Sequence, residues 1–124
     1  MNLLLDTHAL LWWLDASPRL SEKASAEIAN GENLVFVSAV VVWEIRIKEA
    51  LGKLCIPPNF REVLEKENFE NLPITSSHAH AVARLPAHHR DPFDRMLVAQ
   101  ALEESLNVVT HDRQIGLYDI NILW

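Results

Sequence analysis

Short apolar runs alternate along the chain with segments of helical periodicity, and this alternation is the feature that most restricts the fold. Runs rich in leucine, valine, isoleucine and phenylalanine predict strands; they cover 2–5, 33–37, 69–74, 106–110 and 119–124. The segments between them predict helices over 8–15, 21–30, 38–51, 59–67, 75–85 and 91–105. The sequence therefore predicts an α/β fold, a three-layer α/β/α sandwich with a central, mainly parallel sheet of about five strands.

Length and composition predict one ordinary globular domain. At 124 residues the chain can bury a core without disulfides, so we expect a single domain over 1–124. Cys55 is the only cysteine, which excludes an internal disulfide and fits a reducing compartment. The apolar run after Met1 is too short for a signal peptide or a membrane span. We therefore expect a cytoplasmic protein with no membrane partner.

The net charge of −6 argues against a general polyanion binder, because lysine and arginine supply nonspecific affinity for nucleic acids. This argument is weakened if some of the acids hold a metal ion, because the bound cation cancels their charge locally. Substrate binding would then depend on the remaining basic residues.

Three acidic residues are expected at one edge of the sheet. Asp6 directly follows the first apolar run, Asp112 lies just past the fourth, and Glu44 lies six residues into the helix that begins at Ser38. In an open parallel sheet, ligands bind beyond the carboxyl ends of the strands. Asp94 lies in the first turn of its helix and reaches the same edge only if that helix points its N-terminus toward it.

Each acid also has an explanation that needs no metal. Asp6 and Asp112 could cap helices, Asp94 could interact with a helix dipole, and Glu44 could pair with Lys48. Glu44 is the hardest to explain in this way, because the run VFVSAVVVWEI is otherwise apolar and a buried carboxylate needs a partner. Together the four acids form an oxygen-only ligand set that suits Mg²⁺ or Mn²⁺ rather than zinc and predicts phosphodiester hydrolysis.

Four stretches of the sequence carry a resemblance to a known family. They are LLLDTHALLWWL, VSAVVVWEIRIKEALGKL, HRDPFDRMLVAQALEE and VVTHDRQIGLY, and together they span nearly the whole chain in the expected order. On these motifs the chain resembles PIN domains, and specifically the VapC-type toxins of bacterial toxin–antitoxin pairs.

The resemblance implies a metal-dependent endoribonuclease that acts on RNA as the toxin of such a pair. It assigns catalysis and the binding of Mg²⁺, or Mn²⁺, to four acids: Asp6, Glu44, Asp94 and Asp112. It also implies supporting hydroxyls at Thr7, Ser38 and Thr110, whereas Asp91 is expected to cap its helix. A small antitoxin protein and a second copy of the chain in a homodimer are the partners that the resemblance implies.

Basic and aromatic residues near these motifs are further candidates. Arg46, Arg95 and Arg113 are candidates for binding RNA phosphates, although a salt-bridged or solvated surface explains each equally well. A zinc site at His78 and His80 is not expected, because residues two apart on a helix point in different directions. Trp12 and Trp13 have two candidate roles besides core packing, contact with the antitoxin and stacking on a base.

Two other classes of function compete with a nuclease. One is a catalytically inactive PIN-fold module that only binds protein, and the presence of all four acids argues against it. The other is a Mg-dependent phosphatase or receiver-like domain, which also places an aspartate after a strand. The motifs DTH and THD fit those two classes poorly.

Overall fold

The computed structural model describes all residues from 1 to 124 and contains every strand and helix that the sequence predicts. The strands are β1 (Asn2–Leu5), β2 (Leu34–Ser38), β3 (Glu70–Leu72), β4 (Asn107–Val109) and β5 (Ile122–Leu123). The helices are α1 (Thr7–Leu14), α2 (Glu22–Ala29), α3 (Ala39–Ala50), α4 (Phe60–Glu65), α5 (Ser76–Val82) and α6 (Pro92–Glu104). A short 3-10 helix, η1 (Ile115–Leu117), forms the turn before β5.

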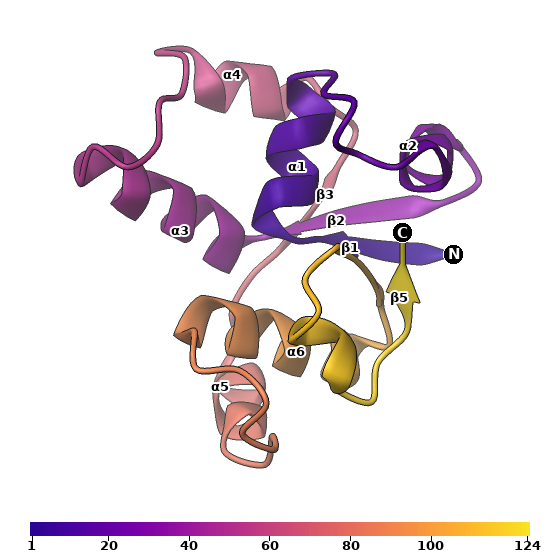
Figure 1. Cartoon of the computed structure of the whole chain (residues 1–124), viewed down its shortest axis with the longest axis vertical. Coiled ribbons are helices and arrows are strands. Elements are labelled where there is room, and N and C mark those ends of the chain that lie inside the picture. The colour runs from indigo at the N-terminus through magenta and orange to yellow at the C-terminus, as the bar shows by residue number, and fades with distance from the viewer.

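The strands form one parallel sheet in the order β3-β2-β1-β4-β5. In Figure 1, α1, α3 and α4 lie on one side of β1 and β2, and α5 and α6 lie on the other. The predicted α/β/α sandwich with five strands is therefore confirmed. In a parallel sheet, all carboxyl ends meet at one edge, so this topology brings residues from distant parts of the chain together.

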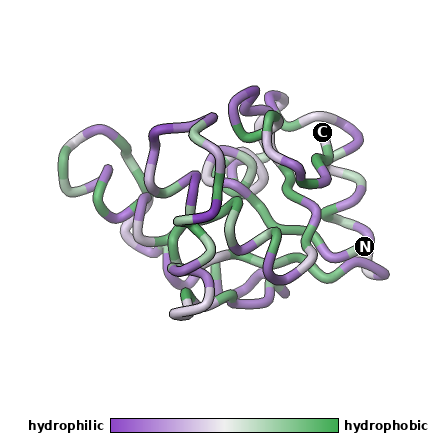
Figure 2. The backbone as a smooth tube through the Cα atoms, turned by 90° about the horizontal axis from the view of Figure 1, so that it is seen from below, coloured by the Kyte–Doolittle hydropathy of each residue, from purple (hydrophilic) through white to green (hydrophobic).

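The central strand β1 is apolar on both of its faces. Leu3, Leu4 and Leu5 are completely buried, as a strand covered by helices on both sides requires. Figure 2 shows green, hydrophobic stretches running through the middle of the molecule, and purple in many of the peripheral turns. Burying each leucine stabilises the fold by roughly 1.5–3 kcal/mol.

Polar side chains fix where the helices begin. Five of them accept a hydrogen bond from a backbone N–H of the first turn: Asp6, Ser21, Ser38, Thr75 and Asp91. Because α1 begins directly after β1 and α3 directly after β2, two of these caps lie at the carboxyl edge of the sheet. None of the helices has the length and the apolar content that crossing a membrane requires.

Candidate metal centre

Asp6 lies at the carboxyl end of β1 and is only 7% exposed. Its Oδ1 accepts a hydrogen bond from the Ala9 N–H at 2.8 Å, which caps α1, and its Oδ2 accepts one from the Thr110 hydroxyl. Burial raises the pKa of Asp6, and these two hydrogen bonds oppose that rise because they favour the ionised form. The carboxylate is thus fixed by residues that follow two neighbouring strands.

Asp94 and Asp112 meet at the same edge, together with His89. One ligand atom of each of these three residues lies within 4.8 Å of the other two. The His89 Nε2 atom is 2.9 Å from Asp94 Oδ2 and 3.5 Å from Asp112 Oδ2. The helix α6 therefore does point its N-terminus at the carboxyl edge, which the sequence left open.

Asp112 also has the local role that the sequence suggested as an alternative. Its Oδ1 accepts hydrogen bonds from the backbone N–H groups of Gln114 at 2.7 Å and Ile115 at 3.1 Å. Its backbone N–H donates to the Thr110 hydroxyl at 3.0 Å. One carboxylate oxygen thus organises the turn, while Oδ2 faces His89.

The pKa of Asp94 is raised to about 7. Burial is the largest cause, followed by the negative charge of Asp91; Glu44 and Asp112 raise it further, while His89 opposes the rise. A carboxyl group that is crowded by other carboxylates in this way is relieved by a bound cation.

His89 is a member of the site that the sequence reasoning missed. Its Nδ1 accepts a hydrogen bond from the Asp91 N–H at 3.1 Å, so in the neutral ring Nε2 carries the hydrogen. The Nε2 atom is buried and has no partner in hydrogen-bond geometry, although Asp94 Oδ2 is close enough for an ion pair. Its position five residues before Asp94 in the HHRDPFD motif was the available signal.

Arg95, a candidate for contact with RNA phosphates, makes several hydrogen bonds within the protein. Its guanidinium donates to the backbone oxygens of Pro86 at 3.0 Å and Val82 at 3.1 Å, and to the Tyr118 hydroxyl at 3.2 Å. The Tyr118 hydroxyl also accepts from the His89 N–H at 3.0 Å. Arg95 therefore holds the loop before α6, and with it the backbone of His89, in place.

Glu44 is 5% exposed, and both of its carboxylate oxygens have partners. The Thr7 hydroxyl donates to Oε1 at 2.7 Å, and the Lys48 ammonium lies 2.6 Å from Oε2. The hydrogen bond to Glu44 is the largest cause of the raised pKa of Lys48. The pairing with Lys48 that the sequence suggested is therefore present, and Glu44 still lies near enough to raise the pKa of Asp94.

The four acids thus converge unequally. One carboxylate oxygen of Asp94 lies within 4.8 Å of one of Asp112, whereas Asp112 acts on Asp6, and Glu44 on Asp94, through their charges. Thr7 and Thr110 lie beside the acids as expected, each donating to one of them.

Ser38 makes no hydrogen bond to the four acids. It caps α3 and donates its hydroxyl hydrogen to Gln100 Oε1 at 2.6 Å, in the buried interior. Gln100 in turn donates to the Pro73 carbonyl at 3.3 Å. Ser38 therefore ties β2 to α6, which carries Asp94, and has no direct contact with a candidate ligand.

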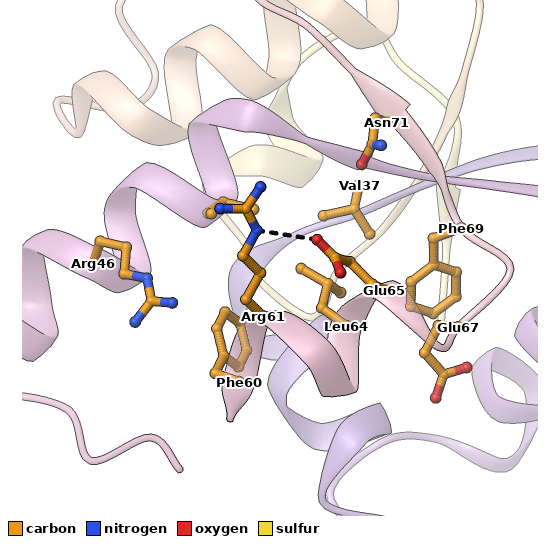
Figure 3. A pocket seen from close by; sticks show the side chains of 10 residues that line it. Val37, Arg46, Phe60, Arg61, Leu64, Glu65, Glu67, Phe69 and Asn71 are labelled. Atoms are coloured by element: carbon orange, nitrogen blue, oxygen red, sulfur yellow. Dashed lines mark hydrogen bonds and ion pairs between the residues drawn. The ribbon is translucent and has the colours of Figure 1, made fainter. Parts of the chain in front are cut away.

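Arg46 and Arg113 lie in different surroundings. Arg46 pairs with Glu49 at 2.9 Å, lies over the ring of Phe60, and borders a hollow of about 440 Å³ between α3, α4 and the strands β2 and β3. Figure 3 shows this hollow, which none of the four acids lines. Arg113 is exposed next to Asp112.

The residues at the carboxyl edge fit a divalent cation. Carboxylate oxygens are the ligands that Mg²⁺ and Mn²⁺ prefer, and the burial and the neighbouring carboxylates that raise the pKa of Asp94 disfavour its ionised form when no cation is bound. The His89 ring presents a nitrogen that bears hydrogen rather than a lone pair, so its geometry suits a partner of the carboxylates better than a ligand.

The family of the chain follows from its match to a family model. The model of the PIN domain matches residues 3–121. The chain therefore belongs to the PIN domain family. It is also 32% identical over 117 residues to Ribonuclease VapC22 of Mycobacterium tuberculosis, with 92% of this chain and 89% of that protein covered.

Solved structures support the same fold. VapBC2 from Rickettsia felis, bound to a DNA fragment from its promoter, matches with a TM-score of 0.73 and 13% identity over 98% of this chain and 97% of that one. DNA-bound VapBC from Salmonella typhimurium matches with a TM-score of 0.71 and 19% identity, over 98% of this chain and 96% of that one. FitAcB from Neisseria gonorrhoeae matches with a TM-score of 0.69 and 24% identity, over 97% of this chain and 95% of that one.

Proposed function

We propose that this protein is a metal-dependent endoribonuclease that hydrolyses RNA phosphodiester bonds and acts as the toxin of a toxin–antitoxin pair. The observation that carries the proposal is the meeting of Asp94 and Asp112 at the carboxyl edge, with Asp6 and Glu44 beside them. The 32% identity with a protein named as a ribonuclease supports this activity.

In this proposal the ion is Mg²⁺ or Mn²⁺, held by Asp6, Glu44, Asp94 and Asp112, which are also the catalytic residues. Such an ion supplies Lewis-acid activation of water and neutralises charge at the phosphate. The chain itself supplies the arrangement of these carboxylates.

Three other side chains support the acids in the proposed site. Thr110 and the Ala9 N–H fix Asp6, while Thr7 orients Glu44 and Lys48 balances its charge. Because these partners hold the carboxylates before any ion arrives, little reorganisation is needed on binding.

Arg113 is the best placed of the three candidate arginines to bind an RNA phosphate, since it is exposed and adjacent to Asp112. Arg46 pairs with Glu49, and Arg95 donates to backbone carbonyls. Both guanidinium groups are therefore less available for binding substrate. Arg46 and Arg95 therefore contribute mainly through the fold.

The remaining parts of the proposal concern the surroundings of the enzyme. We propose one PIN-like nuclease domain over 1–124, a cytoplasmic location, a small antitoxin partner and a homodimer. Several structures of similar fold are named as VapBC complexes, which supports the antitoxin. The single cysteine supports the location.

Cleavage of RNA by the purified, antitoxin-free protein tests the activity. We expect Mg²⁺ or Mn²⁺ to stimulate cleavage, and EDTA to stop it, when the new RNA ends are mapped across a whole transcriptome. Asp6→Asn and Asp94→Asn should lower the rate by at least about 100-fold while the fold is kept, because each removes a charge from the ion site. Asp119→Asn, at an exposed acid outside the site, is the matched control and should retain activity.

Two outcomes would count against the proposal. Cleavage that persists in EDTA, or in both Asp variants, would show a contaminating or metal-independent nuclease. A chain that binds its antitoxin but cuts no RNA with any divalent ion would instead be an inactive binding module.

A further inference from the structure

Four aromatic rings form a continuous strip beside the acids. The His8 and Trp12 rings stack with centroids 5.4 Å apart and planes 11° from parallel. Trp12 meets Trp124 edge to face at 5.8 Å, and Trp124 stacks on His111 at 5.1 Å and 8°. We call these four residues, His8, Trp12, Trp124 and His111, the aromatic strip.

The strip lies at the carboxyl edge of the sheet. Leu5, Val109 and Leu123 are paired across β1, β4 and β5, so the residues that follow them, Asp6, Thr110 and Trp124, stand at the same level. His8 is two residues after Asp6, and His111 lies between Thr110 and Asp112. The two ends of the strip, His8 and His111, are thus two residues and one residue in sequence from the proposed ion ligands Asp6 and Asp112.

The tryptophans and the histidines of the strip differ in exposure. Trp12 and Trp124 are partly buried and pack against the hydrophobic core, whereas His8 and His111 are exposed. Neither exposed imidazole makes a hydrogen bond or a close ion pair within the chain. Each histidine ring therefore stacks on a partly buried tryptophan, and its ring nitrogens have no hydrogen-bond partner in the protein.

The edge has few free positive charges with which to hold RNA. Lys48 is paired with Glu44, and Arg95 is engaged by backbone carbonyls, which leaves Arg90 and Arg113 as the exposed cations near the acids. In a chain of net charge −6, phosphate contacts alone give weak binding. Stacking of bases on aromatic rings is the other general source of affinity for single strands.

We infer that the aromatic strip is a stacking platform for unpaired bases of the RNA on either side of the bond to be cut. This inference rests on the proposed function, since it takes the scissile phosphate to lie at the acids between His8 and His111. Bases within a duplex are stacked on their neighbours and cannot lie on a protein ring, so the platform selects single-stranded segments.

Binding measured without cleavage tests the inference. Asp94→Asn in EDTA, which should not cleave RNA, serves as the background protein in which the other substitutions are made. Fluorescence anisotropy with a labelled single-stranded 12-mer RNA gives the dissociation constant. We expect His111→Ala to weaken binding about 5- to 100-fold, the range for loss of one stacked base, and His111→Phe to restore most of it. His80→Ala, at an exposed histidine on α5, is the matched control and should bind like the background. A duplex of the same sequence should bind weakly to all variants.

A scan with abasic nucleotides separates stacking from a structural effect. One base at a time is removed from the RNA, and we expect the affinity of the background protein to fall at one or two positions near the cleavage site. In His111→Ala, removal of the base that stacks on His111 in the background protein should cause no further loss of affinity. Additive losses at every position, or equal binding by His111→Ala and the background, would overturn the inference.

The inference and the proposed function can fail separately. If the protein cuts RNA but His111→Ala changes the effect of no abasic position, the inference alone is overturned. Coupling in the abasic scan by a chain that never cuts RNA would overturn the nuclease instead. If the strip variants bind RNA normally but lose affinity for the antitoxin, the strip is a protein contact and the inference is wrong.

Discussion

Asp91 and Asp94, three residues apart, do different work at the start of α6. Asp91 Oδ1 accepts hydrogen bonds from the N–H groups of Phe93 and Asp94, at 2.8 and 3.2 Å, which caps the helix. Asp94 makes no such bond and faces His89. The cost of this arrangement falls on Asp94, whose pKa is raised to about 7 by burial and by the neighbouring carboxylates.

This raised pKa makes the stability of the metal-free protein depend on pH. Between the ordinary value of 3.8 and about 7, the folded protein keeps a proton on Asp94 that the unfolded chain has lost. The contribution of Asp94 to the free energy of unfolding therefore decreases as the pH rises through this window, and it is lowest above pH 7.

Asp94→Asn should remove that dependence, because asparagine does not ionise. We expect the variant in EDTA to melt about 3–5 °C above the wild type at pH 8, and at nearly the same temperature at pH 4. Circular dichroism melts at both pH values measure the difference. A variant less stable than the wild type at pH 8 would show that the ionised carboxylate is stabilised in the fold.

His89 is expected to orient the carboxylates of Asp94 and Asp112 from outside the ion site. His89→Ala should weaken Mn²⁺ binding about 10-fold or more, as is typical for partners of metal ligands, and His89→Gln, which keeps an N–H donor, should weaken it less. Isothermal titration calorimetry gives both constants. Tighter binding by His89→Ala would mean that the imidazole competes with the ion.

At the residue scale, the sequence was sufficient where position in the chain decides where a side chain lies. Asp6 and Asp112 follow strands, so the topology alone brings them to one edge. His89 and Arg95 depend on the path of the loop before α6, which is fixed by the Tyr118 hydroxyl 23 residues or more away in sequence. No local pattern reports such a contact.

At the scale of the elements, the N-terminus of α6 connects the fold to the site. Pro92 at the start of the helix and Asp91 as its cap fix the first turn, and Asp94 lies in that turn. A change in the cap is therefore expected to affect the ion site as well as the stability.

Substitutions of Asp91 test the contribution of the cap to stability. Asp91→Ala should lower the free energy of unfolding by about 1 kcal/mol, because two N–H groups lose their acceptor. Asp91→Asn keeps an acceptor and should cost much less, so it serves as the control. Urea titrations of both variants give the two values, and equal losses would show that the charge of Asp91, rather than its capping, stabilises α6.

The elements themselves were predictable because their periodicity and caps are local. The least accurate boundaries are the start of β5, at Ile122 instead of Asp119, and the end of α5, at Val82 instead of Leu85. The order of the strands was not predictable, since β1 pairs with β4 across more than 100 residues of chain. Such pairing depends on packing between segments that no short window contains.

At the scale of the whole molecule, the proposed ion site would link folding to metal binding. Any ion that binds the folded chain and not the unfolded one stabilises the fold by an amount set by its concentration. The crowding around Asp94 would make this gain larger, since a bound ion would remove a repulsion that the metal-free protein retains.

We therefore expect Mg²⁺ or Mn²⁺ to raise the melting temperature of the wild type. At 100 times its dissociation constant, the ion should add about 2.7 kcal/mol to the free energy of unfolding. Asp112→Asn should lose most of this gain, and NaCl at the same ionic strength should not reproduce it. Equal shifts in the wild type and in this variant would place the ion elsewhere on the protein.

The common level of Asp6, Thr110 and Trp124 on three parallel strands also matters for handling the protein. A reporter fused after Trp124 would emerge at the rim that holds the acids and would obstruct access there. One fused before Met1 would start at the opposite rim, ahead of β1, and would leave that access free.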